Sequence, residues 1–213
     1  MKIISHRGNG FKYKGNTKEA ILNALSISYI DGVEFDIRIT KDKKIVVIHD
    51  LVIDLVSNGK GFVKNMTYKE LLKYNFGTLE KYSKISTLDE VLKEINNDKI
   101  ILIELKEETN DYKDFVDIVF NIISKYKLNI YITSFNYELL KYFKTKYNKC
   151  GLLIGLGLNT KKLYNHFDFN IVSYNYRNKV DLKETFVWGF KGYKEDLDKF
   201  NVITDKPDLF KHI

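Results

Sequence analysis

The sequence predicts an α/β fold: a TIM-type (β/α)8 barrel with a β-hairpin extension after the second strand. Three observations favour it. Nine short, apolar, β-branched runs recur along the chain, amphipathic stretches separate most of them, and one connection is too short for a parallel crossover. Residues 1–213 are expected to form a single domain, since no linker, low-complexity segment or repeat divides them. An open doubly wound sheet is the alternative fold.

The nine runs have the length and composition of buried strands. They cover residues 2–5, 33–37, 45–49, 100–105, 130–135, 152–156, 170–174, 186–190 and 201–204. Without the return arm of the hairpin, eight strands of parallel type remain, which is the number that closes a TIM-type barrel. A length of 213 residues is slightly under the ~250 usual for that fold.

Four stretches between the runs have apolar residues at i, i+3 and i+4, the spacing of helices with one buried stripe. The stripes are Ala20, Ile21, Ala24 and Leu25; Leu88, Val91, Leu92 and Ile95; Phe115, Ile118, Val119 and Ile122; and Leu139, Leu140 and Phe143. Two pairs have the spacing of a capping box at a helix start: Asn16 with Glu19, and Thr87 with Glu90.

The runs at 33–37 and 45–49 are too close for a parallel connection, which needs about a dozen residues or more. We therefore expect a hairpin with residues 41–44 as its turn. In that register Thr40 faces Ile45, and Asp36 faces His49.

Composition limits the possible partners. The net charge of +7, with 15 Tyr and 14 Phe, would suit nucleic acid, but the lysines are interspersed with nearly as many acids and form no basic block. No nucleic-acid partner is expected. No apolar run approaches the roughly 20 residues of a membrane span, and no secretory signal precedes the first strand, so a cytoplasmic location is expected. The single cysteine, Cys150, has the apolar neighbours of a core residue. The oligomeric state is left open.

Ionisable residues gather where the expected strands end. Residues two apart on a strand point to the same face of the sheet, as Glu34 and Asp36 do, and Glu104 and Lys106. The ionisable residues are His6 and Arg7 after the first run, Glu34 and Asp36 on the second, His49 on the hairpin arm, and Glu104 and Lys106 after the run at 100–105. Active sites of (β/α)8 barrels lie at the carboxyl ends of the strands, so these residues are expected to converge there.

Three carboxylates in apolar strands are costly to bury unless they are neutralised. Glu34, Asp36 and Glu104 together are suited to a hard divalent cation, Mg²⁺ or Ca²⁺, which takes oxygen ligands. The alternative is that Glu34 or Glu104 merely pairs with Arg7 or Lys106.

Two histidines beside such a metal site suit cleavage of a phosphodiester. One imidazole, of His6 or His49, would take a proton from the nucleophile and the other would give one to the leaving oxygen. Arg7 and Lys106 would stabilise the phosphate charge. Trp188 lies in the run at 186–190, where it either packs in the core or faces the substrate.

Several segments, in order and spacing, resemble the glycerophosphodiester phosphodiesterase family. They are SHRGNG…GNTKEA, GVEFDIRITKDKKIVVIHD, LIELK, TSF and VITDKPD. The resemblance implies a metal-dependent TIM-barrel enzyme over residues 1–213, which hydrolyses glycerophosphodiesters to glycerol 3-phosphate and an alcohol and has a place in lipid and glycerol metabolism. It implies these roles: His6 and His49 as acid–base histidines, Glu34, Asp36 and Glu104 as metal ligands, and Arg7 and Lys106 as phosphate contacts.

The sequence departs from the family pattern around the substrate. Gly15 stands where the usual P-E-N-T segment has its glutamate, LVS at 55–57 replaces an Arg-Thr-Thr segment, and GFK follows Trp188 in place of Thr-x-Asn. The substrate is therefore left open among small soluble diesters, a glycerophosphoryl group on a polysaccharide and a lysophospholipid headgroup. Two other functions also stay open: a phospholipase D-like or phosphate-cyclising reaction on the same kind of barrel, and a non-catalytic module that binds a phosphate ligand.

Overall fold

The structure of the chain is a computed structural model. It describes residues 1–8, 12–107, 112–155, 166–167, 169–173, 175, 184–189, 192, 197 and 199–211. The last residues of three expected strands, at positions 156, 174 and 190, lie outside these ranges.

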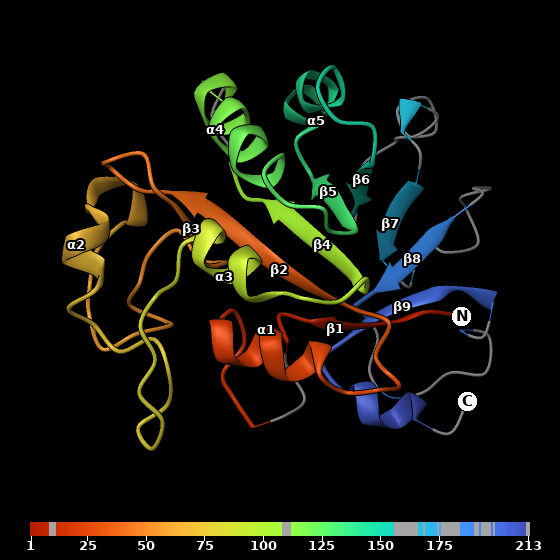
Figure 1. Cartoon of the computed structure of the whole chain (residues 1–213), viewed down its shortest axis with the longest axis horizontal. Helices are drawn as coiled ribbons and strands as arrows, with labels where there is room; N and C mark the ends of the chain where they lie inside the picture. The colour runs from red at the N-terminus through yellow and green to blue at the C-terminus, as the bar shows by residue number, and fades with distance from the viewer. Residues whose placement is uncertain are drawn as a thin grey trace.

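Eight parallel strands in the described part of the chain form a closed barrel (Figure 1). They are β1 (Ile3–His6), β2 (Gly32–Ile39), β4 (Ile100–Leu105), β5 (Ile130–Ser134), β6 (Cys150–Ile154), β7 (Phe169–Ser173), β8 (Thr185–Trp188) and β9 (Asn201–Thr204). The barrel closes because β1 pairs in parallel with both β9 and β2. The TIM-type barrel is thus confirmed, and the open doubly wound sheet is wrong.

The ninth strand, β3 (Ile45–Val47), pairs antiparallel with β2 and forms the expected hairpin. Its register differs by one residue from the prediction: Ile39 faces Ile45, and the Ile48 N–H donates to the Asp36 carbonyl oxygen. The reason is a tighter turn, in which Thr40 bonds to Lys44 and Lys43 adopts a left-handed φ of 58°. A type I turn followed by one left-handed residue gives such a three-residue loop.

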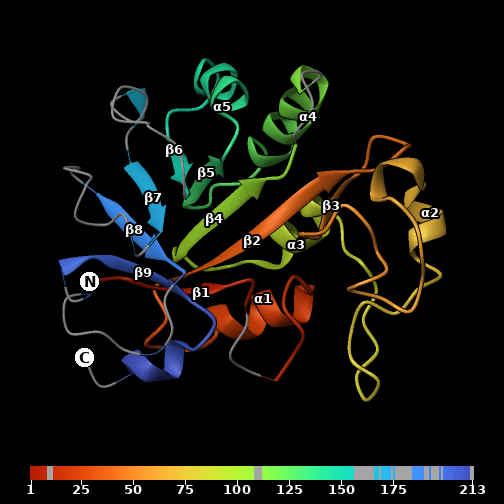
Figure 2. The same cartoon turned by 180° about the vertical axis from the view of Figure 1, so that it is seen from behind.

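The described helices lie outside the barrel, along the side formed by β1 to β6, as the two opposite views show (Figures 1 and 2). They are α1 (Lys18–Leu25), α2 (Tyr68–Leu71), α3 (Leu88–Glu94), α4 (Lys113–Ile123) and α5 (Tyr137–Lys144), with 3-10 turns at Val63–Asn65 and Pro207–Phe210. The four expected helices are confirmed, while the short α2 was not expected. In α4 the fully buried side chains include Val116 and Ile123, whereas Ile118 and Ile122 are only partly buried. None of the helices described is both long enough and apolar enough to cross a membrane.

One of the two expected capping boxes forms, and the other does not. Thr87 and Glu90 form the expected box at the start of α3. At α1 the prediction was wrong, because the capping side chain is that of Thr17, which accepts from the Ala20 N–H. Asn16 has a left-handed φ of 60°, and its side chain bonds to Asp36 instead of capping the helix.

The barrel separates an outer apolar layer from an inner one. Alternate strand residues pack outward against the helices, and this larger cluster includes the buried Cys150. A smaller cluster fills the interior. Gly151 leaves room there, since a Cβ at that position would lie 2.3 Å from the Phe169 ring. On β4 the inward residues run from Leu102 to Glu104, so the interior changes from apolar to charged toward the carboxyl ends of the strands.

Residues 51–86, between β3 and α3, form an insertion beside the carboxyl end of β2, at the left of Figure 1. The insertion has a small apolar core of its own, which includes Ile53, Val63, Leu71 and Phe76. Val46 on β3 belongs to the same cluster and anchors the insertion to the hairpin. That residues 1–213 act as one domain stays a prediction.

Candidate active site

A pocket of about 170 Å³ opens at the carboxyl ends of the barrel strands. Its lining includes seven of the eight residues predicted for the site: His6, Arg7, Glu34, His49, Glu104, Lys106 and Trp188. The eighth, Asp36, is buried beside them and contributes its carboxylate to the same cluster. The remaining lining is Thr133, Phe135, Leu153, Ile171 and Ile203. The fold therefore brings all the predicted residues together.

The three carboxylates come from two neighbouring strands. Asp36 on β2 faces Glu104 on β4 directly, and Glu34 lies two residues earlier on the same face as Asp36. One oxygen from each carboxylate lies within 4.8 Å of the others. All three residues are buried, with 8% exposure or less, so their charges interact with little screening by water.

Burial and mutual repulsion raise the pKa of two of these carboxyls. Burial first and the charge of Asp36 second raise the pKa of Glu34 to about 7. The same two causes raise the pKa of Glu104 to about 8. Burial acts in the same sense on Asp36, but the charges of Lys106 and Arg7 outweigh it and lower the pKa of that carboxyl.

Two cations neutralise part of this charge. Arg7 Nε lies 3.2 Å from Asp36 Oδ2, and Lys106 Nζ lies 2.5 Å from Glu104 and 3.3 Å from Asp36 Oδ1. The expected alternative of a carboxylate–cation pair is thus present for Glu104, and Asp36 pairs with both cations. If all three carboxylates are ionised, Arg7 and Lys106 leave one negative charge, which a protonated His6 beside Glu34 would offset.

The turn after β1 places Arg7 in the lining of the pocket. Arg7 and Gly8 both have left-handed φ values, 55° and 67°, and the Arg7 N–H donates to Glu34 Oε2 at 3.2 Å. A Cβ at position 8 would lie 2.6 Å from the Ala20 carbonyl carbon, so glycine is needed for both conformation and space. This packing explains the glycine of the H-R-G motif.

His6, at the end of β1, lies between two carboxylates. Its Nδ1 is 2.7 Å from Asp205 Oδ1, and its Nε2 is 3.7 Å from Glu34 Oε2. Burial lowers the pKa of His6, but the hydrogen bond to Asp205 and the charge of Glu34 outweigh it, so the net pKa is raised. The environment therefore favours a protonated imidazole.

His49 follows β3 in a different environment. Its Nδ1 lies 2.7 Å from Asp50 Oδ1, and its carbonyl oxygen accepts from Arg38 Nε at 2.7 Å. Arg38 Nη1 also donates to the Lys106 carbonyl oxygen at 2.6 Å, which ties the hairpin arm to the end of β4. Burial is the largest influence on His49 and lowers its pKa, although the charge of Asp36 and the hydrogen bond to Asp50 act in the opposite sense. The environment favours a neutral imidazole.

Trp188 forms an apolar wall opposite the charged residues of the pocket lining. Its ring meets Phe135 edge to face, with centroids 6.2 Å apart. The Trp188 Nε1 atom is buried and has no hydrogen-bond partner among the described residues. Leu153, Ile171 and Ile203 extend this wall into the barrel.

Comparison with known families gives a specific match. The family model described as "Glycerophosphoryl diester phosphodiesterase family" matches residues 6–174. The chain belongs to this family.

A curated glycerophosphodiester phosphodiesterase of Caldanaerobacter subterraneus is 35% identical over 165 residues, which cover 73% of this chain and 68% of the relative. A glycerophosphodiester phosphodiesterase of Bacillus altitudinis is 33% identical over 67% of this chain and 61% of its own length. The chain thus spans about two thirds of the length of these relatives.

Solved structures extend the likeness over the whole chain. A glycerophosphodiester phosphodiesterase from Thermotoga maritima has a TM-score of 0.77 at 31% identity, covering 99% of this chain and 96% of that one. A phosphodiesterase from Oleispira antarctica, solved in complex with the product sn-glycerol-3-phosphate, has a TM-score of 0.82 at 17% identity, covering 100% and 96%. The second likeness supports the fold alone. Membership of the phosphodiesterase family makes this chain a glycerophosphodiester hydrolase.

Four residues of this phosphodiesterase site were not predicted as parts of it. Asp205 and Asp50 orient the two histidines, Asn16 holds Asp36, and Arg38 joins the backbones of His49 and Lys106. The signals were present in the sequence, since Asp50 and Asp205 lie within the H-D and T-D-K-P segments. The partner of Asp205 could not be identified from the sequence, because Asp205 is 199 residues away from His6 along the chain.

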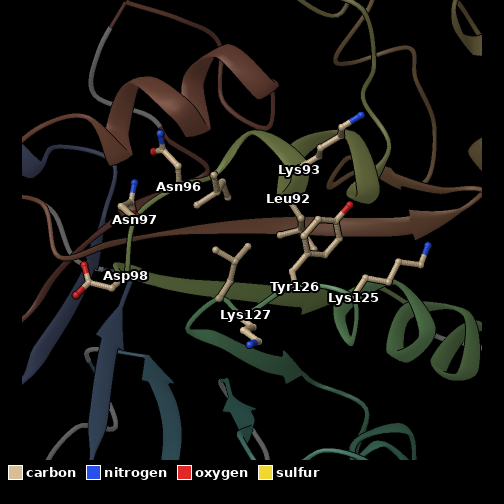
Figure 3. Close-up of a pocket in the computed structure, with 10 residues that line it drawn as sticks. Leu92, Lys93, Asn96, Asn97, Asp98, Lys125, Tyr126 and Lys127 are labelled. Atoms are coloured by element: carbon tan, nitrogen blue, oxygen red, sulfur yellow. The ribbon is translucent and has the colours of Figure 1, made fainter.

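A second hollow, of about 640 Å³, lies away from this site. Its lining comes from the segments that precede β4 and β5, including Asn96, Asp98, Lys125 and Tyr126 (Figure 3). These segments enter the amino ends of the strands, and enzymes with this fold do their chemistry at the carboxyl ends. The smaller pocket around Glu104 is therefore the candidate active site.

Proposed function

We propose that this chain hydrolyses glycerophosphodiesters to glycerol 3-phosphate and an alcohol, with a divalent cation, Mg²⁺ or Ca²⁺, and two histidines as acid and base. One observation carries the proposal. His6 and His49 line the same pocket as the cations Arg7 and Lys106 and a buried cluster of three carboxylates. This combination provides a base, an acid and charge stabilisation within reach of one phosphate group.

The residues present fit a divalent cation. Glu34, Asp36 and Glu104 offer hard oxygen donors from two rigid strands, all within 4.8 Å. Asp36 Oδ1 is buried and accepts no hydrogen bond in good geometry from a described residue, although Lys106 Nζ lies 3.3 Å away. Burial and the charge of Asp36 raise the pKa values of Glu34 and Glu104, so ionising all three carboxylates without a further cation is costly. A bound cation would reduce this cost.

When bound, the cation would supply Lewis-acid stabilisation of the charge that develops on the phosphate oxygens. Arg7 and Lys106 would add positive charge on the same group. Their carboxylate partners hold both side chains in place before the substrate arrives, and such preorganised charge stabilises a transition state more than a flexible cation does.

The charge environments of the histidines suggest a division of labour. His6 lies between Asp205 and Glu34, which keep a proton on its imidazole, so we assign it as the general acid for the leaving alcohol oxygen. His49 is kept neutral, so we assign it as the base that takes a proton from the attacking water. The water oxygen bonds to phosphorus as the bond from phosphorus to the alcohol oxygen breaks. The proton of the attacking water moves to His49, and the proton of His6 moves to the leaving alcohol oxygen.

Trp188 and Phe135 would contact the carbon skeleton of the substrate, because they form the apolar wall of a pocket whose other wall is charged. Trp188 Nε1 has no hydrogen-bond partner among the described residues and would donate to a hydroxyl oxygen of the substrate. The roles of Trp188 and Phe135 and the identity of the substrate are part of this proposal. A place in lipid and glycerol metabolism and a cytoplasmic location are proposed with them.

The metal claim is tested by titrating Mg²⁺ or Ca²⁺ into the metal-free protein by calorimetry and assaying a glycerophosphodiester in parallel. Chelation should abolish turnover reversibly. Glu104→Gln should weaken binding and reduce turnover by several orders of magnitude, since Lewis-acid stabilisation contributes several kcal/mol. Glu138→Gln, at the first turn of α5, is the matched control and should change neither. Full activity of Glu104→Gln in chelator would remove the cation from the proposal.

A further inference from the structure

The insertion presents a large apolar side chain at its most exposed point. Residues 76–83, which we name the tip hairpin, include Leu79 and Tyr82, with 105% and 61% of their surfaces exposed. The tip hairpin is part of the yellow segment that extends away from the barrel in Figures 1 and 2. Single exposed apolar residues are common on proteins, so the exposure has meaning only in combination with its surroundings.

The tip hairpin is held in one conformation. The Thr78 N–H donates to the Lys81 carbonyl oxygen and the Phe76 N–H to that of Ser83. Asn75 Oδ1 accepts from the N–H groups of both Gly77 and Ser83. Leu79 therefore lies at the end of an ordered turn, and no described residue buries it.

Two other exposed segments adjoin the tip hairpin. Lys81 Nζ donates to the Lys12 carbonyl oxygen at 3.1 Å and lies 5.0 Å from the centre of the Tyr13 ring. On the other side of that segment, Lys14 Nζ donates to the Val56 carbonyl oxygen, next to Leu55, whose exposure is 78%. We name Leu55, Leu79 and Tyr82, with the lysines at 12, 81 and 84, the tip surface.

The insertion that carries the tip surface is basic. The insertion at 51–86 carries six lysines against three acidic residues, Asp54, Glu70 and Glu80, a net charge of +3. Lys12 and Lys84 are exposed, while Glu70 is engaged in the capping box of α2. Exposed leucine and tyrosine among lysines have the composition of surfaces that insert shallowly into an anionic lipid interface. A second copy of the chain would bring like charges together and is the weaker fit.

The loop after β1 connects the tip surface to the site. Residues 12–14 belong to the loop that follows His6 and Arg7, and Asp50, the partner of His49, is close enough to Lys14 to act on it electrostatically.

From these contacts we propose that the tip surface docks this protein on the surface of membranes that contain anionic phospholipids. Leu79, Leu55 and Tyr82 enter the interface, and the lysines lie at the level of the lipid phosphates. Docking is a binding event that does not require turnover, so it can be measured whether or not the proposed hydrolysis is correct.

Sedimentation with vesicles tests the proposal. The full chain is mixed with vesicles of phosphatidylcholine alone, or with vesicles that also contain phosphatidylglycerol, at low and high salt. Wild type should bind the anionic vesicles more strongly, and salt should weaken the binding. Leu79→Gln should reduce partitioning by roughly tenfold, the effect expected for a leucine withdrawn from an apolar phase. Lys84→Gln should weaken binding to anionic vesicles only.

The matched control is Leu209→Gln, which alters an exposed leucine in the 3-10 turn at Pro207–Phe210 and should bind like wild type. Thermal unfolding verifies that each variant is folded. No binding by wild type, or equal binding by Leu79→Gln, would overturn the proposal. Concentration-dependent dimerisation that Leu79→Gln abolishes, with no vesicle binding, would assign the surface to a second copy and also overturn it.

Discussion

Asn16 and Asp36 exchange two hydrogen bonds across the mouth of the barrel. The Asn16 Nδ2 donates to Asp36 Oδ2 at 2.8 Å, and the Asp36 backbone N–H donates to Asn16 Oδ1 at 3.1 Å. The pair fixes the rotamer of a carboxylate proposed as a metal ligand. Partners of this kind orient ligands, and their loss typically costs about 10- to 100-fold in metal affinity or activity.

Asn16→Ala should therefore weaken metal binding and turnover by roughly 10- to 100-fold. The adjacent Thr17→Ala is the matched control, because it removes the N-cap of α1 and should cost about 1 kcal/mol of stability without changing metal affinity. Calorimetric metal titration and urea unfolding of both variants separate the two effects. Equal metal affinity in Asn16→Ala and wild type would show that the pair is structural only.

The two histidine variants should respond differently to the leaving group. An alkyl diester needs a proton on its leaving oxygen, whereas p-nitrophenolate leaves without one. His6→Ala should lose about 10²- to 10⁴-fold on glycerophosphocholine and recover much of that loss on a p-nitrophenyl diester. His49→Ala should be slow on both.

Turnover of both substrates by both variants at saturating metal provides the measurement. Rescue of His49→Ala in place of His6→Ala would reverse the assignment. Rates near wild type for both variants on the alkyl substrate would make the two histidines structural.

The pH profile should show the lowered pKa of His49. Burial is the first cause of the shift, and Lys106 and Arg7 act in the same sense, while Asp36 and Asp50 oppose it. A base must be neutral, so kcat/KM should fall only as the pH drops through a value below the ordinary ~6.5 of histidine. A bound cation nearby would lower that value further. At saturating metal the bound cation would keep Glu34 and Glu104 ionised, so an acid limb above ~6.5 under that condition would contradict the assignment of His49 as base.

Elements that depend on local pattern were predictable. Each of the nine apolar runs became a strand, because β-branched side chains in short runs have few other ways to be buried. The spacing of Glu34, Asp36 and Glu104 on their strands was enough to place three carboxylates on one face.

Features that depend on a single backbone conformation or a distant partner were not predictable. The hairpin register depends on the left-handed conformation of Lys43. Glycine or asparagine at that position would have indicated such a conformation, but lysine does not. Asn16 had the spacing of a capping residue, but its contact with Asp36 prevailed. The insertion has short apolar segments with no clear period, so its core became visible only in three dimensions.

The most direct test of the proposed function follows the fate of glycerophosphocholine in water enriched in heavy oxygen, with Mg²⁺ or Ca²⁺ present. Phosphorus NMR and mass spectrometry identify the product and the position of the label. The account predicts glycerol 3-phosphate that carries the heavy oxygen on phosphorus, together with unlabelled choline. A cyclic phosphate as the final product, label in choline, or no turnover of any glycerophosphodiester with either ion would contradict it.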